Sequence, residues 1–312
     1  MDLNRVREYR DKITANCGKV ILGKEDVIQH LLECWLCGGH ILLEDVPGTG
    51  KTMLLRAFAA SVGGSFKRIQ FTPDLLPTDL TGIQYYNRKT EEFEFRPGPL
   101  FAQIILADEI NRATPRTQSA LLEAMEEKQI TADGVTRRLK EPFMVMATQN
   151  PLESYGTFAL PEAQTDRFFM RLKMGYMTRQ QELEVMRRKP ARTIIEELKP
   201  VVTEEETASV MEEVRKVHVA DDTADYMMNI IEATRSQDHP ERGVSARGTI
   251  ALYAAAQARA ALNGRDYVIP EDVRELAVCV LAHRMGSTVS MAESNAWIES
   301  ILARIPVPTE NV

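Results

Sequence analysis

The residues best suited to chemistry form a Gly-rich loop between an apolar run and a predicted helix. Ile41-Leu42-Leu43 leads, after Glu44, into Asp45-Val46-Pro47-Gly48-Thr49-Gly50-Lys51-Thr52. In such a loop the backbone N–H groups point inward and the following helix adds the positive end of its dipole, so the loop can hold a triphosphate. Lys51 is expected to reach the β- and γ-phosphates, and Thr52 to hold Mg²⁺. Asp45 stands where the full pattern has Gly, so other residues must support this interpretation.

A second pair of candidate residues follows an apolar segment at residues 100–106. Asp108 and Glu109 come just after this segment, which is predicted to be a buried strand. In phosphoryl transfer, such an Asp orders the Mg²⁺ shell and such a Glu can activate the attacking water. An apolar strand followed by Asp-Glu also arises by chance. Its position after the phosphate loop and between two further predicted strands favours the functional interpretation.

Three more polar residues lie near predicted element ends. Asn150 follows the strand predicted at residues 143–147, where the carboxyl ends of parallel strands form a ligand crevice, so it could orient the attacking water; alternatively, it caps the turn before Pro151. Arg167 ends a short helix predicted at residues 160–168, and an Asp-Arg pair alone is more typical of a surface salt bridge. Arg247 opposes the dipole at a predicted helix start, which indicates an anionic partner, although a solvated Arg is the alternative.

The elements around these residues predict an α/β fold with a parallel sheet. Strands are expected at residues 68–71, 100–106 and 143–147, and β-hairpins at 83–95 and 129–137, the second with an Asp-Gly turn. Beyond Met177 the signals are almost all helical, at residues 179–188, 204–216, 221–236, 245–263, 270–284 and 290–304. We therefore expect a nucleotide-binding domain at residues 1–177 and a helical lid at residues 178–312.

Two short segments before the loop each allow two interpretations. Ile21, Leu22 and Gly23 could wall an adenine base, or they could belong to a buried strand or the core. Cys34 and Cys37 have the spacing of a metal or redox site. However, the chain has no second cysteine pair, and residues 26–37 form an amphipathic pattern, so two small apolar residues near a helix end are favoured.

The composition limits the possible binding partners and the expected location in the cell. The chain has 312 residues and a formal net charge of -7, which disfavours charge-driven binding to nucleic acid. Arg137, Arg138 and Lys140 near the second hairpin are the feature in favour of a DNA motor, although three such cations are more often solvated. Residues 1–20 have no apolar signal-peptide core and the chain has no apolar run of about 18 residues, so we expect a cytoplasmic protein without membrane insertion.

The order of these motifs resembles the AAA+ ATPases, and within them the MoxR family, over nearly the whole chain. The resemblance rests on residues 39–52, Asp108-Glu109-Ile110-Asn111-Arg112-Ala113, Gln118-Ser119-Ala120-Leu121-Leu122-Glu123-Ala124-Met125, Ala147-Thr148-Gln149-Asn150-Pro151 and Leu160-Pro161-Glu162-Ala163-Gln164. Asp45 in place of Gly looks like the usual variant of that family. The two hairpins match the helix-2 insert and the pre-sensor-1 insertion of the clade that includes magnesium chelatases.

The resemblance implies a role for each candidate residue. Lys51 and Thr52 match the Walker-A pair, Asp108 and Glu109 the Walker-B pair, and Asn150 the sensor-1 position. Arg167 matches the arginine finger that reaches a neighbouring subunit's γ-phosphate, and Arg247 matches the sensor-2 Arg of the lid, acting either in cis or in trans. The residues expected to contact ATP or ADP are then Ile21, Leu22, Gly23, Pro47, Gly48, Thr49, Gly50, Lys51, Thr52, Met53 and Arg247.

The function implied by the resemblance is a Mg²⁺-dependent ATPase that forms a ring, expected to be a hexamer. Such a ring would remodel, mature or activate a partner protein, with insertion of a metal cofactor as one outcome. A von Willebrand factor A partner would be a separate chain, because no Asp-x-Ser-x-Ser pattern occurs here. Two alternatives remain: a nucleotide-dependent switch or scaffold with slow hydrolysis, and, less favoured, a motor acting on DNA.

Overall fold

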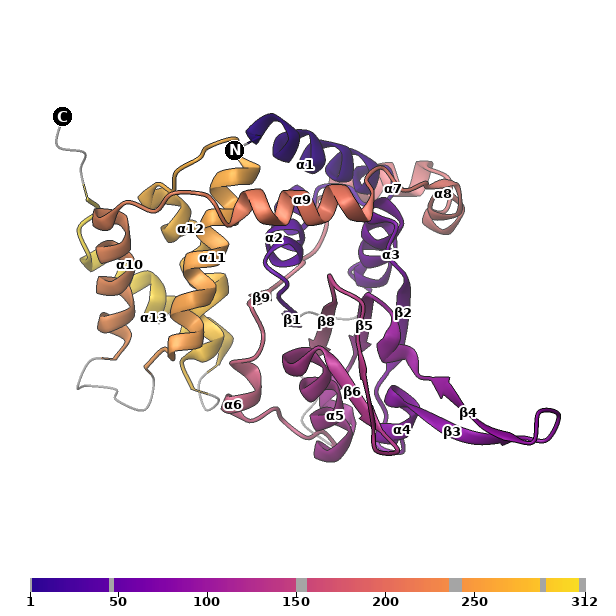
Figure 1. Ribbon diagram of the computed structural model, residues 1–312. Coiled ribbons are helices and arrows are strands. Elements are labelled where there is room, and N and C mark those ends of the chain that lie inside the picture. The colour runs from indigo at the N-terminus through magenta and orange to yellow at the C-terminus, as the bar shows by residue number, and fades with distance from the viewer. Residues whose placement is uncertain (1, 45–47, 150–155, 236–242, 287–289, 309–312) are drawn as a thin grey trace.

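A parallel five-stranded sheet organises the amino-terminal part of the chain (Figure 1). The computed structural model describes residues 2–44, 48–149, 156–235, 243–286 and 290–308. The strand order is β2 (Phe66–Gln70), β5 (Ile104–Asp108), β8 (Met144–Gln149), β1 (Ile41–Glu44) and β9 (Met170–Leu172), and every pairing is parallel. The predicted α/β fold with a parallel sheet is confirmed. Strand β9 was not predicted, and β5 begins later than residue 100 and includes Asp108 itself.

Alternate residues of the central strands pack into two different hydrophobic cores. Ile41 and Leu43 belong to one core, whereas Leu42 between them belongs to the other. The first core lies against α1 (Leu3–Gly18), α2 (Glu25–Leu36) and α3 (Lys51–Val62), and the second against α4 (Pro77–Thr81) and α5 (Pro115–Glu127). Because successive strand side chains point to opposite faces, helices cover both sides of the sheet. The polar ends of the strands are left to form a site.

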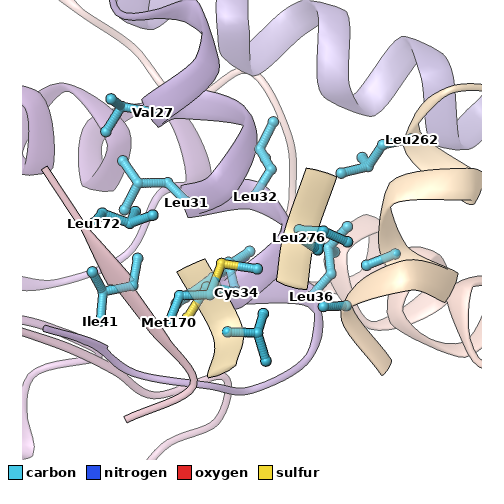
Figure 2. Close-up of a cluster of buried hydrophobic side chains, with 14 of the residues drawn as sticks. Val27, Leu31, Leu32, Cys34, Leu36, Ile41, Met170, Leu172, Leu262 and Leu276 are labelled. Carbon is cyan, nitrogen blue, oxygen red and sulfur yellow. The ribbon is translucent and has the colours of Figure 1, made fainter. Parts of the chain in front are cut away.

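The carboxy-terminal part is helical, as predicted. Its helices are α7 (Arg179–Arg187), α8 (Ala191–Glu197), α9 (Glu204–Val214), α10 (Asp221–Thr234), α11 (Ala246–Leu262), α12 (Pro270–Leu281) and α13 (Met291–Arg304). Helix α8 was not predicted, and the helix predicted at residues 160–168 is only α6 (Glu162–Thr165). The helical part shares the first core: Leu262 of α11 and Leu276 of α12 belong to the same buried cluster as Leu36 of α2, Ile41 and Met170 (Figure 2).

Two β-hairpins extend beyond the sheet, at the positions predicted for them. They are β3 (Gly82–Asn87) with β4 (Glu92–Pro97), and β6 (Gln129–Ala132) with β7 (Val135–Arg138) (Figure 1). The Asp133 carboxylate accepts a hydrogen bond from the backbone N–H of Gln84 at 3.3 Å, and the Arg137 guanidinium lies 3.8 Å from the centre of the Phe95 ring. Lys140 forms an ion pair with Glu204. Two of the three cations that favoured a DNA motor therefore have partners within the chain.

Cys34 packs in the first core. Its side chain is fully buried at the end of α2, and burial raises its pKa well above the ordinary value for a thiol. The Cys37 thiol donates a hydrogen bond to the Ala254 carbonyl of α11 at 3.4 Å. The surroundings of both cysteines agree with the apolar interpretation, in which they pack as small apolar residues near a helix end.

His40 connects β1 to β8 and α5, and it makes stability depend on pH. Its Nδ1 accepts from the Val145 amide at 3.0 Å and its Nε2 donates to the Met125 carbonyl at 3.0 Å. Burial lowers the His40 pKa to about 4. The unfolded chain gains this proton near the ordinary pKa of about 6.5, so the neutral ring's contribution is complete above that pH and is lost as the pH falls towards 4.

We expect His40 to remove about 1.3 kcal/mol from the free energy of unfolding between about pH 7.5 and 5.5. Urea denaturation at both pH values, with wild type and His40→Gln, measures this contribution. The variant should lose less stability on acidification than wild type does. His218→Gln, at an exposed histidine, is the control and should keep the wild-type difference. Equal losses in wild type and His40→Gln would contradict the prediction.

Candidate nucleotide site and arginine face

The phosphate loop is described from Gly48 onward and runs directly into helix α3. Gly48 and Gly50 have φ values of +88° and +90°, a backbone region that side chains with a Cβ rarely adopt. Gly50 is the residue before α3, so the first N–H groups of that helix face the loop. Asp45, Pro47 and the candidate sensor Asn150 lie outside the described residues. The described part of the loop has the backbone that an anion cradle requires.

A cavity of about 380 Å³ brings the loop together with the ends of three strands. Strand β5 contributes Asp108, with Glu109 directly after it, and β2 and β8 contribute neighbouring polar residues. The described residues that line the cavity are Gly48, Gly50, Lys51, Thr52, Met53, Arg68, Gln70, Asp108, Glu109, Thr148 and Gln149. The two candidate acids and the phosphate loop therefore share one cavity, as expected for strand ends in a parallel sheet.

Thr148 of β8 joins the two candidate acids. Its hydroxyl donates to Asp108 Oδ1 at 2.7 Å and accepts from the Glu109 amide at 2.8 Å. Glu109 has a φ of +57° and a ψ of +51°, which is uncommon for a residue other than Gly. The backbone therefore turns sharply after β5, and Thr148 holds this turn.

Strand β2 supplies two side chains that cover the carboxylates of Asp108 and Glu109. Arg68 Nη2 lies 2.7 Å from Asp108 Oδ2, and Gln70 Nε2 donates to Glu109 Oε2 at 2.8 Å. We did not single out Arg68 or Gln70 from the sequence. The sequence feature that could have revealed them is their position two residues apart in a short predicted strand, because side chains at alternate positions of a strand point to the same face.

The segment before α2 lies next to the phosphate loop. Ile21 Cδ1 is 3.8 Å from where a Cβ on Gly50 would lie, and Gly23 has a φ of +63° with the Gln181 amide of α7 packed against it. Lys24 is buried, and its ammonium donates to the carbonyls of Met174, Gly175 and Tyr176 at 2.6, 3.2 and 3.1 Å. This segment, the loop and the chain that leads to α7 are therefore held together.

The two candidate arginines both contact Glu126, and neither is among the described residues that line that cavity. Arg167 Nη1 lies 3.1 Å from Glu126 Oε2 of α5, and Arg247 Nη2 forms an ion pair with Glu126 Oε1. Arg247 Nη1 also lies 3.3 Å from Asp166 Oδ2. The anionic partners indicated for Arg247 are thus Glu126 and Asp166, and Asp166 pairs with Arg247 instead of its neighbour Arg167. We name Arg167, Arg247 and Glu126 the arginine face.

Asp166 fixes the start of α11 to the α/β part. It accepts hydrogen bonds from the Ser245 hydroxyl at 3.0 Å and from the Arg284 guanidinium at 2.5 Å. The Arg284 side chain is 1% exposed and also donates to the Phe168 carbonyl at 2.7 Å. A buried and multiply bonded ion pair of this kind is costly to break from one side. Arg247 is therefore carried by a rigid connection and does not lie on a loosely attached helix.

Comparisons with known proteins agree with this fold. Residues 40–170 match the model of the ATPase family associated with various cellular activities (AAA), and residues 232–304 match the AAA lid domain. A crystal structure of a proposed ATPase from Cytophaga hutchinsonii superimposes with a TM-score of 0.88 at 39% identity and covers 98% of both chains. The class of the protein is therefore an AAA+ ATPase with its lid.

The sequence relatives identify the family within that class. The chain is 38% identical to the chaperone MoxR1 of Mycobacterium tuberculosis, over 92% of this chain and 78% of MoxR1. It is 32% identical to the protein MoxR of Paracoccus denitrificans, over 96% of each chain, and 49% identical to the Bacillus subtilis protein YeaC, over 96% and 95%. The chain belongs to the MoxR family of AAA+ ATPases. No helix among the described residues has the length and apolar character needed to cross a membrane.

Proposed function

We propose that this chain is a Mg²⁺-dependent ATPase whose active sites are completed between subunits of a ring, and whose turnover remodels or matures a partner protein. The observation that carries this proposal is the separation of the site into two parts. The phosphate loop, Asp108 and Glu109 share one cavity, whereas Arg167 and Arg247 share a different surface. A phosphoryl-transfer site needs cations opposite the phosphate loop, and a second copy can supply them.

The residues of the cavity fit a nucleotide and its metal ion. Lys51 would hold the β- and γ-phosphates, Thr52 and Asp108 would hold Mg²⁺, and Glu109 would accept a proton from the attacking water. Asp108 lines this cavity together with Lys51 and Thr52, and its pairing with the Arg68 guanidinium on Oδ2 supports a role in holding a cation. Bound Mg²⁺ would neutralise charge that develops on the phosphates. The segment with Ile21, Leu22 and Gly23 is the proposed wall for the base.

Arg247 is proposed to act in trans together with Arg167. Glu126 contacts both arginines, and Asp166 ties Arg247 to the segment that bears Arg167. Because one carboxylate holds both side chains, we propose that they approach the same ligand, the nucleotide of the next subunit. A hexameric ring, a separate von Willebrand factor A partner, a cytoplasmic location and a domain boundary near residue 177 are further parts of this proposal. The name of the relative MoxR1, a chaperone, supports the protein-remodelling role.

One observation favours the alternative of a slow nucleotide switch. In the single chain, Glu109 accepts a hydrogen bond from Gln70, and Asp108 is paired with Arg68. A water-activating carboxylate that is occupied in this way is poorly placed to act as a base. Steady-state turnover with and without a partner protein separates a slow switch from a motor.

A mixing experiment tests the shared site. Glu109→Gln removes the proposed base but keeps the arginines, whereas Arg167→Ala removes the finger but keeps the base, so each variant alone should be nearly inactive. In random equimolar mixtures, roughly a quarter of the interfaces combine an intact Glu109 with an intact Arg167, because the contact between ring neighbours is head-to-tail. We expect ATPase activity to return in proportion. Mixed rings without any recovered turnover would contradict a site shared between subunits.

A further inference from the structure

Glu126 is the only described contact that the two arginines have in common. Its two carboxylate oxygens are divided between them, with Oε2 at 3.1 Å from Arg167 Nη1 and Oε1 paired with Arg247 Nη2. Two guanidinium groups repel each other at short range, so one carboxylate between them lowers the cost of holding them together. In the single chain, Glu126 therefore occupies the position of an anion shared by two cations.

Each arginine has a second anchor that does not depend on Glu126. Arg167 Nη1 also donates to the Leu122 carbonyl at 3.0 Å, and Arg247 Nη1 lies 3.3 Å from Asp166, which the buried Arg284 holds. Neither anchor is a mobile surface side chain. If Glu126 moved away, both guanidinium groups would keep a partner near their present positions.

The Glu126 side chain, by contrast, can move away from the two arginines. Its side chain is 36% exposed and lies on the surface of α5, so rotation about its side-chain bonds would carry the carboxylate into water. Arg167 Nε is buried without a hydrogen-bond partner, so the guanidinium has a donor to spare. The cavity beside it has a volume of about 250 Å³ and is lined by Ser119, Leu122, Glu123, Glu126, Glu127, Gln164 and Arg167. An anion that arrives at the arginine face would find two anchored cations, the displaceable carboxylate of Glu126, and the carboxylates of Glu123 and Glu127 in the lining of the adjacent cavity.

We propose that Glu126 takes the place of the neighbour's γ-phosphate in the unassembled chain and is displaced by it when the ring forms. The inference rests on the proposed function, in which Arg167 and Arg247 act on the nucleotide of the next subunit. Glu126 is then a positioning residue: it keeps the two arginines paired before assembly and competes with the incoming phosphate. Because exposed ion pairs contribute little, the phosphate wins this competition at sufficient protein concentration.

Glu126→Gln tests the competition directly. The amide keeps the shape of the side chain but removes the charge, so the neighbour's nucleotide no longer competes with a carboxylate. ATP turnover per chain should reach half its maximum at a protein concentration about three- to tenfold lower than in wild type. The maximum turnover at high protein concentration should change by less than about twofold, because the arginines keep their other anchors.

Two matched variants separate this role from general effects of charge. Glu299→Gln removes the same charge from an exposed residue of α13, outside the described lining of the cavity beside Arg167, and should leave the half-maximal concentration near that of wild type. Glu126→Asp restores the carboxylate and should restore most of the wild-type requirement. Sedimentation with ATP, in a background carrying Glu109→Gln, reports assembly without turnover and should show the same order of variants.

The outcomes separate this inference from the proposed function. If wild-type turnover per chain does not depend on protein concentration and the mixing experiment fails, the shared site itself is wrong. If those two experiments succeed but Glu126→Gln needs the same or a higher protein concentration, only the displacement of Glu126 is overturned. An equal shift in Glu299→Gln would also overturn it, because the effect would then come from the overall charge of the chain.

Discussion

Arg167→Ala is expected to lower ATP turnover of the assembled protein by a factor of about 10³–10⁵ while leaving nucleotide binding nearly unchanged. The arginine is absent from the described lining of the cavity that contains Lys51 and Asp108, so its loss should not disturb a nucleotide bound there. In phosphoryl transfer, charge builds on the phosphate oxygens in the transition state, and an opposed arginine stabilises that charge more than the ground state. The effect should therefore appear in kcat and not in the dissociation constant.

Steady-state turnover and equilibrium binding of ATP, measured on the same preparation, check this separation. Arg192→Ala is the matched control, because Arg192 is an exposed arginine of α8 whose side chain is 79% accessible. The control should retain wild-type turnover. Arg167→Ala with wild-type kcat would remove Arg167 from the reaction, and a large loss of ATP affinity would indicate a contact within its own subunit.

Local patterns were sufficient to predict most of the fold. Helix α5 lies at residues 115–127, where it was expected, because Pro115 starts it and an amphipathic pattern continues to Glu127. The hairpin β6–β7 was recognised from Asp133-Gly134, and both residues have the positive φ that its tight turn requires. Such features depend on residues close in sequence, so the sequence alone reveals them.

Elements that depend on distant partners were missed. Strand β9 has only three residues, and it is a strand because β1 supplies a parallel neighbour more than a hundred residues earlier. Four of the six helices predicted beyond residue 177 end one to two residues earlier than predicted, as is usual where terminal turns fray. Arg68 and Gln70 are ordinary polar residues of an edge strand until the sheet places them beside Asp108 and Glu109.

The relation between the two arginines is also a tertiary property. Arg167 and Arg247 are separated by 80 positions, and only the folded chain shows that both contact Glu126. The sequence therefore left open whether Arg247 acts in cis or in trans. The pairing of both arginines with one carboxylate, together with the rigid link through Asp166 and Arg284, supports a joint role in trans.

Glu109→Gln should reduce turnover by a factor of about 10²–10⁴ while the protein still binds ATP and accumulates as an assembled ring. The substitution keeps the size of a side chain whose backbone has an uncommon positive φ, and Thr148 can still accept from its amide, so the fold of the turn is retained. An amide cannot accept the water's proton, but Lys51, Thr52 and Asp108, the residues proposed to hold the nucleotide and its Mg²⁺, remain in place. Rings that cannot hydrolyse ATP should not be taken apart by hydrolysis.

Light scattering with ATP and Mg²⁺ should therefore show larger particles for Glu109→Gln than for wild type. The control Glu299→Gln, at an exposed residue of α13, should behave as wild type in both measurements. Rapid hydrolysis by Glu109→Gln would show that another residue activates the water, and a failure to bind ATP would show that Glu109 serves the ground state instead.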